Sequence, residues 1–308
     1  MRIFLAAGET AAVYYTAQDW EAATDRNFFC SFWYARKTTK ALAAIGVARK
    51  RSGYITIDSG AHSFFHEAGF AVTSAAGGTR QELAYNYDKY VEEYIAWLRA
   101  HWSYFDFFVE VDIQELVGKE KVEEWRSLYR KHGLWDKCIT VFHSGIATNS
   151  EGNTWEDYES MIAQSGSRYV GIEGKRNQQF TLPYSKMATY AYQNDCRIHV
   201  FAAIDDALIL SAPIFSTDSR GWGATISYGA VTQFNPRRGK LDWKLKASEK
   251  ETVTAGLPIR LAASSKDHRA KLVYAMEQYA LLEEYYTKVW KARGVDWNGV
   301  VERIEGDT

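Results

Sequence analysis

The chain has 308 residues, of which 46% are hydrophobic, and a formal net charge of -1 from 37 basic and 38 acidic side chains. This length and composition predict a large buried core and favour one large domain or an α/β barrel. The balanced charge excludes a globally basic nucleic-acid-binding protein, although a local basic surface remains compatible with it. Three isolated cysteines, Cys30, Cys138 and Cys196, indicate neither a disulfide framework nor a structural zinc site.

The N-terminal apolar run is too short for a secretory signal, and no stretch of the chain approaches the length that crosses a bilayer. We therefore expect a soluble, cytoplasmic protein with no membrane partner. Aromatic residues make up 15% of the chain, with 11 Trp and 20 Tyr. Such rings either fill a barrel core and its helix–sheet interfaces or line a site where planar bases stack.

About eight short segments have the apolar, β-branched or aromatic composition of buried strands, and each closes on small or acidic residues. They are residues 2–9, 54–60, 107–113, 138–145, 169–174, 198–205, 214–219 and 224–231. Amphipathic helices are predicted between or after them, at residues 80–102, 119–133, 154–166 and 265–294.

Near-continuous apolar strands that alternate with amphipathic helices predict parallel strands covered by helices, and about eight such units predict a (β/α)8 barrel of the TIM type. The prediction is a single domain over residues 1–308, with a C-terminal helical extension at about 265–294. A doubly wound open sheet is the alternative. No strand is followed by a GxGxxG or GxxxxGK[ST] sequence, so neither a dinucleotide nor a triphosphate site is indicated.

In such a barrel, side chains at the C-terminal ends of the strands meet at one mouth. The predicted strands end on Glu9, Asp58, Asp112, His143, Glu173, Asp205 and Asp218. Three chemistries use such a set. Metal-dependent hydrolysis would use His62, His143, His199 and Asp218 as ligands; glycoside hydrolysis would use two carboxylates such as Glu110 and Glu173; base exchange at a glycosidic carbon would use one carboxylate as nucleophile and another as acid/base.

Several of these segments resemble the tRNA-guanine transglycosylases in order and rough spacing over residues 3–233. "TIDSGAHSFF" is similar to the family's Asp-Ser-Gly-Gly-Phe tip, and "VEVDI" falls at its second base-binding aspartate. "TVFHSG" corresponds to the strand that ends in Gln-Gly, and "YVGIEG" resembles the Gly-Gly-Leu strand. "RIHVFAAID" looks like the strand before the nucleophile, and "IFSTDS" aligns with the Phe-Asp tip that carries it.

The resemblance implies that Asp218 is the nucleophile of a covalent glycosyl intermediate and that Asp58 is the acid/base group beside the exchanged base. Asp112 would read the donor groups of the base, with a close backbone approach at Gly171. The other residues that we expect to bind the substrate are Ser59, Gly60, His143, Glu173, Ser219, Arg220 and Trp222. Arg220 would meet a phosphate, and Trp222 would wall the pocket.

This chain departs from the tRNA enzymes because it lacks their CxCxxC zinc subdomain and has His143 where they carry glutamine. It looks more like the virus-encoded and defence-linked 7-deazaguanine DNA transglycosylases, which implies DNA rather than tRNA as the polymer and a host cytoplasm if the gene is from a phage. The other partner would be a free base such as 7-cyano-7-deazaguanine. No cofactor and no metal are expected, and a homodimer is one possible assembly.

A polymer substrate also requires a basic surface near the mouth. The segments 48–53, 174–179 and 235–250 are the candidates, and we expect Lys175, Arg176, Arg237, Arg238 and Lys240 to contact nucleic acid. Each of these choices has a plainer structural alternative. The aspartates could cap turns, His143 and His199 could be hydrogen-bonded barrel histidines, the glycines could serve loop geometry, and the basic segments could be solvated faces.

Overall fold

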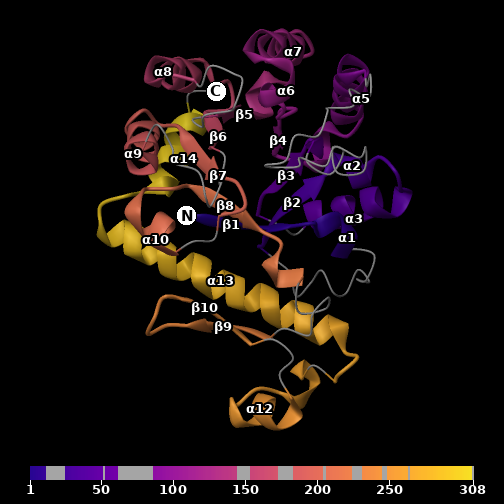
Figure 1. The fold of residues 1–308 in the computed structure, drawn as a ribbon, viewed down its shortest axis with the longest axis vertical. Helices are drawn as coiled ribbons and strands as arrows, with labels where there is room; N and C mark the ends of the chain where they lie inside the picture. Colours follow the sequence, from indigo (N-terminus) through magenta and orange to yellow (C-terminus); the bar gives the residue numbers. More distant parts are fainter. Residues whose placement is uncertain are drawn as a thin grey trace, which may run out of the picture.

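The structure is a computed structural model that describes residues 1–11, 25–50, 53–61, 86–143, 153–172, 183–203, 206–223, 231–244, 248–262 and 264–306. Eight parallel strands form a closed barrel in chain order, and β8 pairs with β1. The strands are β1 (Arg2–Ala6), β2 (Asn27–Ser31), β3 (Ile55–Asp58), β4 (Phe107–Val109), β5 (Cys138–Phe142), β6 (Tyr169–Ile172), β7 (Arg197–Val200) and β8 (Ser216–Ser219). The predicted (β/α)8 fold is confirmed (Figure 1).

Helices surround the barrel on its outer side (Figure 1). They are α1 (Gly8–Ala11), α2 (Phe32–Ala35), α3 (Thr39–Arg49), α5 (Tyr87–Ala100), α6 (Gln114–Val117), α7 (Lys119–Lys131), α8 (Trp155–Gln164), α9 (Tyr184–Gln193) and α10 (Asp206–Ser211). The helices expected at 80–102, 119–133 and 154–166 correspond to α5, α7 and α8. Thr154 caps α8 in a reciprocal capping box with Asp157.

The prediction missed one barrel strand. The missed strand is β2. Of the strand expected at 224–231, residues 224–230 lie outside the described residues, and Val231 begins β9 of a separate hairpin. β2 ends on Ser31, a small residue like those that close the other strands, but aromatic residues resume at once with Phe32 and Trp33 of α2, so the local pattern resembles one continuing apolar segment.

Alternate side chains of each strand point into the barrel or out to the helices. The inward set combines aromatic and apolar side chains, such as Phe4, Phe29, Phe107, Ile139 and Tyr169, with the polar side chains of His199 and Ser216. At the N-terminal ends of the strands, α14 (Trp297–Gly306) closes the barrel, because the ring of Trp297 packs 5.3 Å from that of Phe215. The opposite, C-terminal ends of the strands form the mouth.

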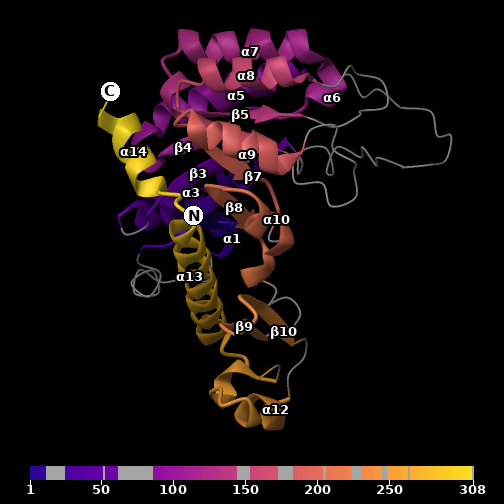
Figure 2. The ribbon, with the colours of Figure 1, turned by 90° about the vertical axis from the view of Figure 1, so that its left-hand side faces the viewer.

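The helix expected at about 265–294 is α13 (His268–Ala292), which runs along the outside of the barrel. Glu283 joins it to the barrel: its carboxylate accepts hydrogen bonds from the Ile3 amide at 2.6 Å and from Asn27 Nδ2 at 3.1 Å. The antiparallel hairpin of β9 (Val231–Asn235) and β10 (Lys240–Lys244) packs against α13, and α12 (Glu249–Thr254) lies farther from the barrel (Figure 2). None of the helices in the described part of the chain is long and apolar enough to cross a membrane.

Candidate active site

Polar side chains at consecutive strand ends surround the mouth. Asp218 stands on β8, Glu9 on α1 directly after β1, Asp58 at the end of β3, and Asp112 and His143 just beyond β4 and β5. Asp218, Glu9 and Asp112 all raise the pKa of Asp58 through their charges, in that order of size, so the four carboxyl groups share one electrostatic environment. The structure thus brings Asp58, Asp112 and Asp218 together, as the sequence predicts.

Asp58 titrates close to neutral pH. Burial is the main cause, with smaller contributions from the neighbouring carboxylates, and together they raise its pKa to about 7. The Gly60 amide donates to Oδ2 at 3.2 Å and opposes part of the shift. A carboxyl group that holds a proton near pH 7 and can release it is suited to general acid and base catalysis.

Asp218 is buried and held by two N–H groups. The Ala202 amide donates to Oδ1 at 2.7 Å, and His199 Nε2 lies 3.3 Å from the same oxygen. Both contacts use Oδ1, and among the described residues no hydrogen bond to Asp218 Oδ2 is present. This arrangement fixes the carboxylate without occupying both oxygens, as a nucleophile requires.

His199 and Ser216 continue this hydrogen-bonded chain into the barrel. His199 Nδ1 lies 2.7 Å from Ser216 Oγ, which also contacts the hydroxyl of Tyr169. If Asp218 is ionised, His199 carries its proton on Nε2, and Nδ1 accepts from Ser216. The ring of His199 stacks on Phe29 with centroids 5.3 Å apart, which fixes its orientation. His199 is therefore a hydrogen-bonded barrel histidine that positions Asp218.

This Ser–His–Asp set differs from a hydrolase triad. Ser216 is fully buried, whereas a nucleophilic serine must reach the substrate. The same geometry gives Asp218 the position next to the mouth and leaves Ser216 beneath it. The arrangement supports a carboxylate nucleophile rather than a hydroxyl one.

Asp112 and His143, both expected to contact the base, contact each other. His143 Nε2 lies 2.5 Å from Asp112 Oδ1, and the Asp112 side chain is 28% exposed. The pair presents a carboxylate and an imidazole side by side, which are groups that can recognise hydrogen-bond donors and acceptors of a planar base.

Glu9 is a mouth carboxyl group for which the sequence predicted no individual role. It is 1% exposed, and the Ser31 amide donates to its Oε2 at 3.1 Å. Burial raises its pKa to about 7, while the charge of Arg220 lowers it. Its place directly after the first strand is the signal by which the sequence analysis counted it among the mouth residues, together with Asp58 and Asp218.

Three of the expected substrate-binding residues have packing roles in the structure. A Cβ on Gly171 would lie 2.5 Å from the ring of Phe201, so this ring occupies the space that we expected a base to approach. Gly60 adopts φ +74°, and a Cβ there would lie 2.5 Å from Trp33. Ser59 is buried, and its carbonyl accepts from Tyr90 at 2.5 Å.

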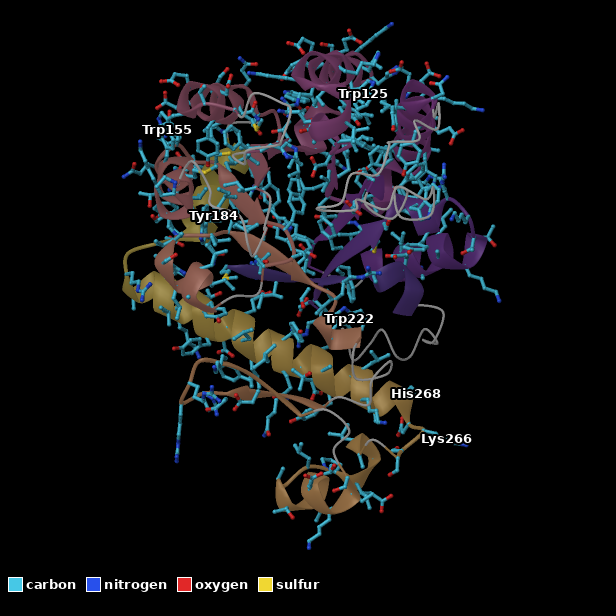
Figure 3. The ribbon with its side chains drawn as sticks, in the orientation of Figure 1. Trp125, Trp155, Tyr184, Trp222, Lys266 and His268 are labelled. Atoms are coloured by element: carbon cyan, nitrogen blue, oxygen red, sulfur yellow. The ribbon has the colours of Figure 1, made fainter. Side chains whose placement is uncertain are left out.

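The residues after Asp218 connect the mouth to α13. Trp222, expected to wall the pocket, is 1% exposed and donates from Nε1 to the Ala6 carbonyl at 2.8 Å, so its ring belongs to the core between the barrel and α13 (Figure 3). Ser219 Oγ lies 3.3 Å from the Tyr279 hydroxyl. Arg220 is exposed, and its charge acts on Glu9.

The expected nucleic-acid contacts on 235–250 lie in the hairpin. Arg237 and Arg238 are exposed in the turn between β9 and β10, and Lys240 begins β10. Arg238 pairs with Asp242 at 2.8 Å. The other predicted site residues, Glu173, Lys175 and Arg176, lie outside the described residues, as do His62 and Asp205.

Glu110, a candidate for glycoside hydrolysis, does not face the mouth. It is buried on the outer side of the barrel, where Arg126 of α7 donates to its two oxygens at 2.7 and 2.6 Å. The Val141 amide adds a third bond at 2.6 Å. The glycosidase assignment of Glu110 is therefore wrong, because this carboxylate joins α7 to the barrel.

Within the ranges that the structure describes, no group of three or more His, Cys, Asp and Glu side chains could hold a metal ion. No protein-family model matches this chain, and no curated protein is significantly similar to it. The geometry of the mouth is therefore the basis for assigning a function.

Proposed function

We propose that this protein is a base-exchange transglycosylase that replaces guanine in DNA with a 7-deazaguanine base. The observation that carries this proposal is the convergence of Asp58, Asp112 and Asp218, from three strands, on one barrel mouth. The fixed geometry of Asp218 and the neutral-range pKa of Asp58 match the two roles that the reaction needs.

The reaction has two displacements. Asp218 Oδ2 attacks C1′ of the target nucleotide, the glycosidic bond breaks, and protonated Asp58 gives its proton to the departing guanine. The ionised Asp58 then takes a proton from the ring nitrogen of the incoming 7-deazaguanine, and that nitrogen attacks C1′ and releases Asp218. Over the cycle guanine leaves with one proton, the incoming base gives up one proton, and Asp58 returns to its protonated form.

Incorporation of labelled base is the first test. The protein is incubated with labelled 7-cyano-7-deazaguanine and either guanine-containing DNA or tRNA, and the label in each polymer is measured. We expect label in DNA with wild type and none with Asp218→Ala. Asp136→Asn, which removes an exposed carboxylate on the Trp135–Lys137 turn, is the matched control and should keep wild-type incorporation.

The two polymers separate the alternatives. Label in tRNA alone would keep the chemistry and overturn the choice of DNA. Incorporation into neither polymer, by a protein whose circular dichroism shows that it is folded, would refute the proposal.

Trapping the intermediate tests the role of Asp218 directly. After incubation with DNA, mass spectrometry of the denatured protein should find a glycosyl adduct on the peptide that contains Asp218. Asp218→Asn should abolish it. An adduct that persists in this variant would assign the nucleophile to another residue.

A further inference from the structure

A separate appendage follows the strand that carries Asp218. Residues 231–271, which we call the arm, comprise the β9–β10 hairpin, α12 and the first turn of α13. In both ribbon views the arm extends away from the barrel, with the N-terminal end of α13 at its far side (Figures 1 and 2). Lys266 and His268 mark this end of α13 (Figure 3).

Charge is divided unequally between the arm and the rest of the chain. The arm contains ten of the 37 Lys and Arg residues but only four of the 38 Asp and Glu residues. Its formal charge is therefore +6, and the remainder of the chain carries -7. A near-neutral total thus conceals a cationic arm on an anionic barrel, a distribution typical of proteins that bind a polyanion through one region.

The barrel by itself is poorly suited to attract a nucleic acid. Its remaining charge is negative, and four carboxyl groups surround its mouth. A phosphate backbone that approaches this mouth is repelled unless cations elsewhere compensate. The arm supplies those cations close in sequence to the mouth, since β9 begins at Val231 and β8 ends at Ser219.

The arm presents its charge to solvent. Arg237, Lys250, Arg260 and Lys266 are exposed. The arm also contains exposed apolar side chains, with Val253 57% and Ile259 55% exposed. Exposed cations beside apolar side chains can contact phosphates together with the sugars or bases of a strand.

The arm is firmly attached to α13. The Phe234 amide donates to Gln278 Oε1 at 3.0 Å, and the ring of Phe234 lies 5.8 Å from that of Tyr285. A Cβ on Gly239 would lie 2.4 Å from the Tyr285 ring, so the hairpin turn rests directly on this side chain. Because Glu283 of the same helix is bonded to β1 and β2, the charges of the arm keep a defined position relative to the barrel.

We propose that the arm is the phosphate-backbone binding element of this protein and that the barrel contributes chemistry but little affinity. The partner is a nucleic acid held through its phosphodiesters. This inference deepens the proposed function and depends on it for its biological meaning, yet the binding is measured without turnover.

The test compares two sets of four charge-removing substitutions. The arm variant carries R237Q, K250Q, R260Q and K266Q. The control variant carries K40Q, K89Q, R99Q and K131Q, which remove four exposed cations from the helices of the barrel. Fluorescence anisotropy measures binding to a labelled 20-nucleotide single-stranded DNA, to its duplex and to RNA of the same sequence, between 50 and 300 mM NaCl.

Each phosphate contact contributes about 0.9 to the slope of log K against log salt for duplex DNA and about 0.7 for a single strand. In the arm variant, the slope of log K against log salt should therefore be shallower by roughly three units. Its affinity at 50 mM NaCl should be more than about tenfold lower. The control variant should stay within about threefold of wild type. Thermal unfolding of both variants checks that the fold is intact.

Equal losses in the two variants, an unchanged arm variant, or a wild type that binds none of the three polymers would overturn the inference. Preference among the probes identifies the polymer. If the arm variant alone loses salt-dependent binding while no base is exchanged, the proposed function fails and the binding role of the arm stands.

Discussion

Asp58 combines burial with the charges of neighbouring carboxylates, and its pKa of about 7 has consequences for the reaction. In the proposed reaction, departure of guanine needs the protonated form, so we expect the rate of glycosyl-adduct formation to fall as the pH rises above about 7. Single-turnover measurements between pH 5.5 and 9 check this. In Asp58→Asn this pH dependence should disappear along with most of the rate. An unchanged profile in the variant would assign the titration to another group.

The same shift predicts how stability changes with pH. The pKa of Asp58 is raised from 3.8, so the folded protein binds this proton more tightly than the unfolded chain does. The resulting stabilisation is complete below about pH 4 and is lost as the pH rises through about 7. At pH 8, Asp58→Asn should therefore be more stable than wild type by at least about 1 kcal/mol, given that one pKa unit corresponds to ~1.4 kcal/mol.

Urea unfolding at pH 4, 6 and 8 measures this difference, which should narrow toward pH 4. Glu9→Gln should behave in the same direction, because burial raises the pKa of Glu9 to about 7. Asp136→Asn is the exposed control and should show no such trend. A stability difference that does not vary with pH would mean that Asp58 is not held in its protonated form.

Variants of Ser216 and Asp218 distinguish which of the two side chains is the nucleophile. Ser216→Ala removes a buried hydroxyl that contacts His199 and Tyr169, so exchange should fall by no more than about tenfold. Asp218→Asn keeps the volume of the side chain but removes the attacking oxygen anion, and exchange should fall by at least about a thousandfold. Single-turnover exchange with labelled base compares them. Equal losses would point to Ser216 instead.

At the scale of elements, a buried ion pair joins α7 to the barrel. Arg126 donates to both oxygens of Glu110, and both side chains are at most 7% exposed. Removing Glu110 leaves the buried Arg126 with only Glu123, whose side chain is 46% exposed, as its partner, so Glu110→Ala should lower the free energy of unfolding by about 3 kcal/mol.

Urea unfolding at pH 7 measures this loss of unfolding free energy and compares it with the loss on breaking an exposed ion pair. Glu93 bonds Arg36 at 2.9 Å but is 46% exposed, so Glu93→Ala should cost no more than about 1 kcal/mol. Similar costs for the two substitutions would contradict the structural role that we assign to Glu110.

The barrel strands show how far local sequence patterns predict secondary structure. Seven of the barrel strands were predicted, because each is a short apolar run that ends on a small or polar residue. β2 was missed because only Ser31 separates its apolar run from the aromatic residues that begin α2. In that case the strand ends where hydrogen bonding to β1 and β3 ends, which is a property of the sheet rather than of the local sequence.

For the whole molecule, α13 connects the arm to the barrel, and one carboxylate of this helix makes several of the contacts. Glu283 accepts from the Ile3 amide and Asn27, and Arg2 lies 3.3 Å away. Glu283→Ala should lower the free energy of unfolding by about 1–3 kcal/mol, because it leaves these donors without their acceptor. Glu284→Ala, which removes the neighbouring exposed carboxylate, should have little effect. Thermal unfolding distinguishes the two variants. Equal decreases in their melting temperatures would contradict the anchoring role of Glu283.

The sequence by itself determined the barrel, most of its strands and the acidic residues at the mouth. Periodicity and composition are local properties, and parallel strands place their C-terminal ends on one side whatever surrounds them. The resemblance to transglycosylases supplied the roles of Asp58, Asp112 and Asp218.

Only the tertiary structure decided which polar residues act on one another. It paired Glu110 with Arg126, placed Ser216 beneath Asp218, filled the space over Gly171 with Phe201 and extended the cation-rich arm away from the barrel. The burial of a side chain and its interaction with other charges depend on neighbours from distant parts of the chain. The sequence of a single strand does not show which residues these neighbours are.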